Sequence, residues 1–137
     1  MLRVRVRVER VDGSRSVELV AIANSGFSGS VPELAVPARV ARELALREVA
    51  EPEPASKLTG DGRVASMVRY PRSVKVYVLG GDRVEGGVVS DVLTLPAVGH
   101  VLLNDKLLGR LGIVIVDAGE GLWCFRDEMG RRIRRGV

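Results

Sequence analysis

Residues 17–34 read VELVAIANSGFSGSVPEL and join a hydrophobic segment to a polar turn. The mostly apolar residues 17–23 predict a β-strand. The triplet Asn24-Ser25-Gly26 follows, and after Phe27 comes a second cluster of small residues, 28–30. Glycine lets the backbone turn where other residues would clash, and Asn, Ser and Gly are also the commonest turn residues. The triplet is therefore either an ordinary turn or a site held rigidly at the end of a strand.

Length and composition predict one soluble globular domain. The 137 residues suffice to bury a core, and the shares of 46% hydrophobic and 28% charged residues exclude a disordered chain. No apolar run approaches the roughly 20 residues that span a bilayer, and the N-terminus lacks the apolar stretch of a secretory signal. A lone cysteine, Cys124, excludes an intramolecular disulfide and favours a cytoplasmic setting. With one Cys and one His a Cys/His metal cluster is excluded, and no cofactor is expected.

The net charge of +4 comes almost wholly from arginine, and five arginines lie within residues 126–137. A basic tail can contact nucleic-acid phosphates, although such a tail is more often a solvated end. The aromatic residues that stack on bases are scarce here, at 4% of the chain. We therefore interpret 126–137 as a basic, Arg-rich C-terminal tail and expect no nucleic-acid partner. A basic β-barrel that binds nucleic acid stays as the alternative.

Periodicity predicts mostly short antiparallel strands. Residues 2–11 alternate valine and arginine, which indicates a half-buried strand, and Asp12-Gly13 indicates a hairpin turn after it. The other segments expected as strands, or as strand-like hairpin arms, are 17–23, 58–68 around a tip at Gly60-Asp61-Gly62, 74–79, 84–92, 101–103, 113–116 and 122–125. Two short helices are expected, one over 37–46 opened by Pro37 and one over 106–111 stopped by Gly112. The pattern predicts an all-β, barrel-like domain with two short helices.

Four segments, in order along the chain, resemble motifs of the retropepsin-like aspartic peptidases. The family motif of two hydrophobic residues, Asp-Thr/Ser-Gly and a further Ser or Gly is similar to AIANSGFSG at 21–29. Residues 36–46 resemble the family's LPxxxAxxLGL segment, and TGDGR at 59–63 resembles the tip of its flap hairpin. VLLNDKLLGRLGIVIVD at 101–117 aligns with the late motif ILGxDxLxxLGIxID. The resemblance implies a retropepsin-like acid-protease barrel with one or two short helices over residues 1–125.

The resemblance also implies chemistry and partners. Peptide hydrolysis in this family uses two aspartates that share one proton, one accepting a proton from water and the other donating to the carbonyl oxygen. One chain supplies one triplet, so the resemblance implies a homodimer that acts on a peptide or protein substrate. Asn24 stands at the catalytic Asp position, with Ser25 and Gly26 completing the triplet. Two Asn24 amides can hold water but carry no titrating proton, so we expect an inactive or nearly inactive aspartic endopeptidase.

Two residues depart from the family pattern, Asn24 and Leu103, the latter standing where glycine is expected. The asparagine is either a mutation that silences an active enzyme or the native residue of a non-catalytic peptide-binding or scaffolding protein. Leu103 favours the second explanation, because silencing an enzyme does not require that change. Ser25 has two interpretations of equal weight: a hydroxyl that braces the opposite triplet across the dimer axis, or a plain turn serine.

The remaining candidates have mainly structural interpretations. The substrate groove is expected to involve Phe27 and Ser28 and the hairpin tip Gly60, Asp61 and Gly62, with Asp61 exposed. Asp117, in Val116-Asp117-Ala118-Gly119, imitates the catalytic motif, yet the residues after it are too few for a second lobe with its own flap. His100 is expected as a boundary histidine, and Cys124 as a buried thiol.

Overall fold

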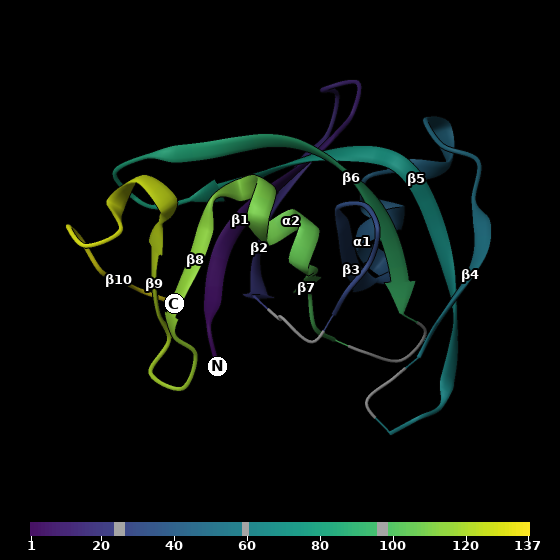
Figure 1. Cartoon of the computed structure of the whole chain (residues 1–137). Coiled ribbons are helices and arrows are strands. Elements are labelled where there is room, and N and C mark those ends of the chain that lie inside the picture. The colour runs from purple at the N-terminus through teal and green to yellow at the C-terminus, as the bar shows by residue number, and fades with distance from the viewer. Residues whose placement is uncertain (24–26, 59–60, 96–98) are drawn as a thin grey trace.

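The computed structural model describes residues 1–23, 27–58, 61–95 and 99–137, and it is mostly β-sheet, as the sequence predicts (Figure 1). The strands are β1 (Arg3–Arg10), β2 (Ser16–Ala23), β3 (Glu33–Pro37), β4 (Glu53–Leu58), β5 (Val64–Leu79), β6 (Val84–Leu95), β7 (Leu102–Leu103), β8 (Ile113–Asp117), β9 (Leu122–Phe125) and β10 (Arg134–Arg135). The helices are α1 (Ala38–Glu43) and α2 (Asp105–Leu111), with 3-10 turns η1 (Leu46–Glu48) and η2 (Arg126–Glu128). The described strands form a seven-stranded sheet, β1-β2-β7-β3-β6-β5-β4, and a three-stranded sheet, β10-β9-β8.

The β1–β2 hairpin confirms the alternating pattern at the N-terminus. Val4, Val6 and Val8 are buried, while Arg3 and Arg5 are exposed on the other face. The two strands pair antiparallel, with Val6 opposite Leu19, and Gly13 in the turn has a φ of 78°. A left-handed φ of this kind favours glycine, so the Asp12-Gly13 signal identified the turn correctly.

Strand β5 is 16 residues long, where the sequence predicts two separate strand-like segments. Its register against β6 shifts between Tyr70 and Val74, and Arg72 there has a φ of 47°. The Arg72 amide donates to Asp91 Oδ1 at 2.8 Å. This irregularity breaks the alternation that marks a strand, which is why the sequence shows two segments. Beyond it, β5 pairs with β1 as well as with β6, so β1 has a partner on both edges.

The expectation of mostly antiparallel strands fails for two pairings, which involve four strands. β3 was not predicted; it pairs in parallel with β6 and antiparallel with β7, and β7 pairs in parallel with β2. β7 therefore lies between β2 and β3. All five residues of β3 are buried, so the strand shows no alternation that could reveal it in the sequence. The connection from β2 to β3, which contains the triplet, begins and ends beside β7.

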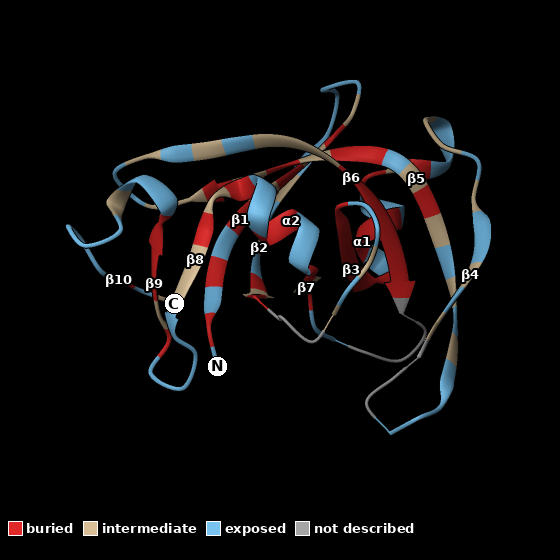
Figure 2. Cartoon of the chain, in the orientation of Figure 1, coloured by how far each residue is buried: buried red, intermediate tan, exposed pale blue. Residues whose placement is uncertain are grey.

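Both helices lie near their expected positions and cover the core. In α2, Leu107, Leu108 and Leu111 are buried, and Gly112 ends the helix with a φ of 74°, as predicted. α1 is shorter than expected and buries Val40 and Ala41. Figure 2 shows buried residues along the strands of the large sheet and in both helices. No helix among the described residues is long and apolar enough to cross a membrane.

Candidate functional site

The triplet Asn24-Ser25-Gly26 and the tip residue Gly60 lie outside the described residues. The neighbours of the triplet are described on both sides. Ala23 ends β2, is buried, and lies beside Leu103 in the parallel pairing with β7. Phe27 is half-buried and Ser28 is exposed. The structure thus fixes where the chain enters and leaves the triplet.

Asn104 holds the segment after the triplet against α2. Its side chain is fully buried, and Oδ1 accepts hydrogen bonds from the amides of Leu107 at 2.9 Å and Glu33 at 3.0 Å. Its Nδ2 donates to the Val31 carbonyl at 2.9 Å. The amide of the next residue, Asp105, donates to the Phe27 carbonyl at 3.0 Å. The sequence interpretation missed this role, although an asparagine directly before a helix is a signature of an N-cap.

Glu33, at the start of β3, is a buried carboxylate held by two cations from the β4–β5 hairpin. Its side chain is only 2% exposed. Oε1 lies 2.8 Å from Lys57 Nζ on β4, and Oε2 lies 3.1 Å from Arg69 Nη2 on β5. A Cβ on Gly29 would overlap this carboxylate, so the chain after the triplet passes directly over it. Buried charges require such partners. A single glutamate within an apolar segment was the one local signal of this pair.

Lys57 also contacts the two residues that follow the triplet. Its Nζ donates to the Ser28 carbonyl at 3.4 Å and lies 5.7 Å from the centre of the Phe27 ring. A cation over an aromatic face is attracted by the ring. Phe27 and Ser28 therefore lie between the first residue of α2 and the β4 arm of the hairpin. Of the predicted substrate-binding residues, the structure places these two at a junction of three segments.

The β4–β5 hairpin turns at the predicted place, although its first arm begins at Glu53, ahead of the predicted segment 58–68. The arms pair antiparallel from Glu53 opposite Arg69 to Leu58 opposite Val64. At the tip Asp61 and Gly62 are exposed, Gly62 has a φ of 83°, and the Arg63 amide donates to Asp61 Oδ1 at 3.1 Å. Residues 64–69 of β5 alternate between exposed and half-buried, so neither face is covered. Figure 1 shows these arms extending beyond the rest of the sheet.

The other candidates have structural surroundings. Asp117 is exposed, and its Oδ1 accepts the Glu120 amide at 3.0 Å, which stabilises the turn after β8. His100 is exposed ahead of β7. Cys124 is buried in β9, as the sequence predicts.

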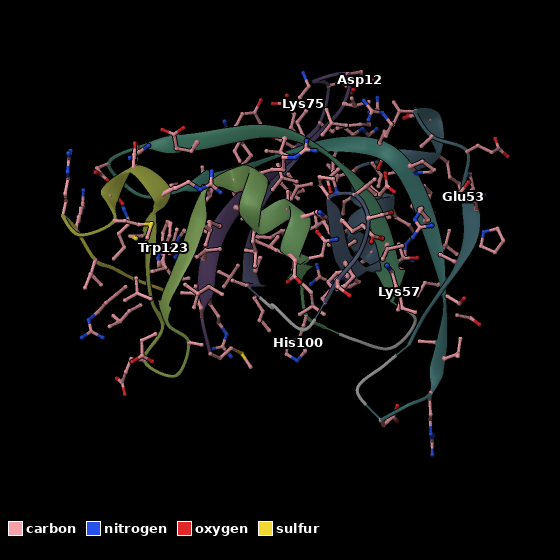
Figure 3. All side chains as sticks on the ribbon, in the orientation of Figure 1. Asp12, Glu53, Lys57, Lys75, His100 and Trp123 are labelled. Carbon is pink, nitrogen blue, oxygen red and sulfur yellow. The ribbon has the colours of Figure 1, made fainter. Side chains whose placement is uncertain are left out.

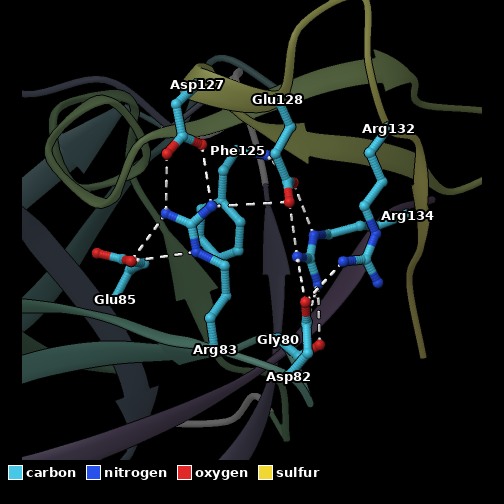
Figure 4. A network of polar contacts seen from close by, with 9 residues as sticks. All are labelled: Gly80, Asp82, Arg83, Glu85, Phe125, Asp127, Glu128, Arg132 and Arg134. Carbon is cyan, nitrogen blue, oxygen red and sulfur yellow. Dashed lines mark hydrogen bonds and ion pairs between the residues drawn. The ribbon is translucent and has the colours of Figure 1, made fainter.

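The C-terminal segment 126–137 is folded onto the domain. The expectation of a solvated end is therefore wrong for Arg134. The Arg134 side chain is 5% exposed and pairs with Glu128 Oε2 and Asp82 Oδ1, both at 2.7 Å. Nearby, Arg83 pairs with Glu85 at 2.8 Å and Asp127 at 3.0 Å (Figure 4). We call these six residues the C-terminal clasp. These ion pairs neutralise positive charge that nucleic-acid binding through the tail would need.

The clasp depresses the pKa values of its carboxylates. Hydrogen bonds from Arg134 lower the pKa of Glu128 to about 2. Hydrogen bonds from Arg134, and to a smaller extent from Arg132, hold the pKa of Asp82 well below its usual range. Arg83 lowers the pKa of Asp127 in the same way. The two guanidinium groups of the clasp, of Arg83 and Arg134, lie 4.2 and 4.9 Å from the Phe125 ring centre, so the clasp covers that ring.

We expect acid to release the C-terminal segment. A carboxylate whose pKa is lower in the folded state stabilises the fold above its unfolded-state pKa, and this contribution is lost as the pH falls towards the folded-state pKa. For Glu128 the window runs from its ordinary value of 4.5 down to about 2. Hydrogen exchange of residues 122–137 should therefore accelerate, relative to β1, as the pH falls through this window. Glu128→Gln should remove part of that pH dependence, whereas exposed Glu120→Gln should not; equal profiles for both variants would contradict the assignment.

Comparisons of this chain with protein-family models, with curated proteins and with solved structures found no match, so the site is interpreted from its own residues.

Proposed function

We propose that this chain is a homodimeric, retropepsin-like protein that binds extended peptides beside residues 24–28, and that Asn24 deprives it of peptidase chemistry. One observation carries the proposal: two of the segments that resemble the family, and the strand that leads into a third, meet at Phe27 and Ser28. The Asp105 amide from the late motif bonds Phe27, and Lys57 from the flap-like hairpin contacts both residues. These segments are far apart in the sequence, so their meeting does not follow from local pattern.

The strand pairings are consistent with the proposed barrel. Following the pairings from β1 through β2, β7, β3, β6 and β5 leads back to β1. A sheet whose pairings close on themselves leaves few free edges, which is what a barrel-like acid-protease fold requires. The hairpin made by β4 and the first part of β5 extends from this circuit and is positioned to cover a peptide.

The chemistry of the described neighbours supports binding without hydrolysis. Aspartic peptidases need two carboxylates that share a proton, and asparagine supplies none. The buried carboxylate nearest to Phe27 and Ser28 is Glu33, and both of its oxygens are engaged by cations. Glu33 therefore cannot serve as a free general base. The main chain of an extended peptide offers donors and acceptors that can pair with amide side chains and backbone groups.

Nuclear magnetic resonance titration tests the peptide-binding proposal. We expect a reduced, carboxymethylated unfolded protein to shift the amide signals of Phe27, Ser28 and residues 61–68, and to remain uncleaved. Lys57→Met should weaken this response, because Lys57 fixes the hairpin next to Ser28. Lys75→Met, a change elsewhere on β5 beside β1, serves as the matched control. Absence of shifts at 27–28 and in the hairpin, at saturating concentrations of the unfolded protein, would refute peptide binding at this site.

A further inference from the structure

A cavity of about 190 Å³ lies between the start of β1 and the C-terminal segment. Four arginines line it: Arg3 and Arg5 from β1, and Arg134 and Arg135 from β10. Trp123 and Val137 complete part of its wall. The peptide-binding proposal uses none of these residues.

Three of the four arginines are unpaired. Arg134 is saturated by Asp82 and Glu128, whereas Arg3, Arg5 and Arg135 are exposed and have no carboxylate within 4.0 Å among the residues that the structure describes. Like charges gathered around one cavity repel each other and create a positive potential that attracts anions. The arginines around the cavity therefore carry positive charge that no described carboxylate neutralises.

The fold brings these arginines together through close backbone contacts. The Val137 amide donates to the Arg3 carbonyl at 2.9 Å, and the Gly136 amide donates to the Gly121 carbonyl at 2.7 Å. A Cβ on Gly136 would lie 2.6 Å from the Arg3 carbonyl oxygen, so only glycine permits this approach without a shift. β10 also pairs with β9, with Arg135 opposite Leu122. The position of Arg135 relative to Arg3 is thus set by contacts among three backbone segments: the start of β1, residues 121–122 and residues 135–137.

Trp123, which lines the cavity, carries a buried hydrogen-bond donor. The indole Nε1 of Trp123 is buried and has no hydrogen-bond partner within the described part of the chain. Trp123 lies in β9 (Figure 3) and is 3% exposed. Because Trp123 lines the cavity, an anion bound there would change the surroundings of its indole ring.

We propose that this cavity binds a phosphate group, as inorganic phosphate or as the end of a small phosphomonoester. Guanidinium groups form paired, charge-assisted hydrogen bonds to phosphate oxygens, and a dianion matches the unpaired charges better than a single carboxylate does. The volume is below the roughly 300–1,000 Å³ of pockets that enclose larger organic ligands. The cavity therefore suits the phosphate group and little more.

Fluorescence of Trp123, the single tryptophan of the chain, tests the proposal directly. Sodium phosphate, added at constant ionic strength against sodium chloride, should produce a saturable change in emission. Arg3→Gln and Arg135→Gln should each raise the half-saturating concentration about tenfold or more, as expected for loss of a charge-assisted hydrogen bond. Arg47→Gln, an exposed arginine in η1, is the matched control and should leave the titration unchanged. Far-UV circular dichroism confirms that each variant is folded, and Arg→Lys variants at the same positions should bind with intermediate affinity.

Further titrations distinguish inorganic phosphate from a phosphomonoester as the ligand. Glycerol phosphate should compete with inorganic phosphate, whereas acetate should bind much more weakly. A response that follows ionic strength alone, or that is unchanged in the Arg3→Gln, Arg135→Gln double variant, would overturn the proposal. Binding of an oligonucleotide without binding of phosphate or glycerol phosphate would also overturn it, because it would indicate a diffuse basic surface.

Discussion

Replacing Asn24 by aspartate is expected to turn this chain into an acid-active endopeptidase, while the present sequence cleaves nothing. The change adds one carboxylate per chain, and a homodimer then has the pair of carboxylates that aspartic peptidases use. General acid–base assistance is worth roughly a hundred- to ten-thousand-fold in rate, so the gain should be measured easily. Cleavage of an unfolded protein between about pH 3 and 7 is the assay.

The pH profile of the Asn24→Asp variant should be bell-shaped. Two close carboxylates repel unless they keep one proton, so the working state is half-protonated. Activity should fall at high pH as the second proton leaves, and at very low pH as both groups become neutral. The C-terminal clasp should survive much of this range, because the pKa of Glu128 in the folded chain is about 2.

Leu103 is a second residue that could prevent catalysis besides Asn24. The leucine stands where the family has glycine, and it is fully buried beside Ala23 and Leu34. Leu103 is therefore part of the hydrophobic core next to the end of β2. Asn24→Ala is the matched control and should stay inactive. An Asn24→Asp variant that is folded and dimeric yet inert at every pH would show that a second residue, with Leu103 the first to examine, also blocks catalysis.

Removing the charge of Glu33 is expected to free the β4–β5 hairpin. Glu33→Gln leaves Lys57 without its buried partner, while Arg69 keeps Asp91 at 3.5 Å, and loss of one member of a fully buried pair costs about 3–5 kcal/mol. Here Lys57 and Arg69 are 23% and 26% exposed and can regain water, so we expect a loss of about 2 kcal/mol in the free energy of unfolding. Denaturant unfolding gives this value.

The same variant should change the local dynamics of the hairpin. Amides of residues 53–58 and 64–69 should exchange faster, while those of β1 and β2 change only with the global stability. Glu53→Gln is the control, because Glu53 is 51% exposed and lies 4.0 Å from Arg69; exposed pairs of this kind contribute about 0–1 kcal/mol. If the hairpin amides of Glu33→Gln kept their exchange rates, the ion pairs would not be what positions the hairpin.

Locally encoded features were predictable from the sequence. The alternation in β1, the Asp12-Gly13 turn and the Gly112 helix end depend on neighbouring residues, and the structure confirms all three. Features that depend on distant segments were not. β3 lacks alternation because both of its faces are covered, and its parallel pairing with β6 joins residues far apart in the chain.

The candidate site, too, was predictable only where it depends on neighbouring residues. The segment 24–28 was identified from its motif, whereas the contacts that surround it come from Glu33, Lys57 and Asn104, which no local pattern marks as a group. A charge in an apolar run, as at Glu33, indicates that a partner exists but not where it lies. The C-terminal clasp was missed for the same reason, because Asp82 and Arg134 meet only in the folded chain.

Crosslinking at position 24 tests most directly the central claim, that two copies of this chain share one site. In a Cys124→Ala background, Asn24→Cys provides one thiol per chain, and Ser14→Cys in the exposed β1–β2 turn provides the control. A short bis-maleimide at micromolar protein should give a covalent dimer in high yield from Asn24→Cys and none from Ser14→Cys, because only position 24 is expected near the two-fold axis. A sedimenting monomer with no crosslink at position 24 would contradict the shared site.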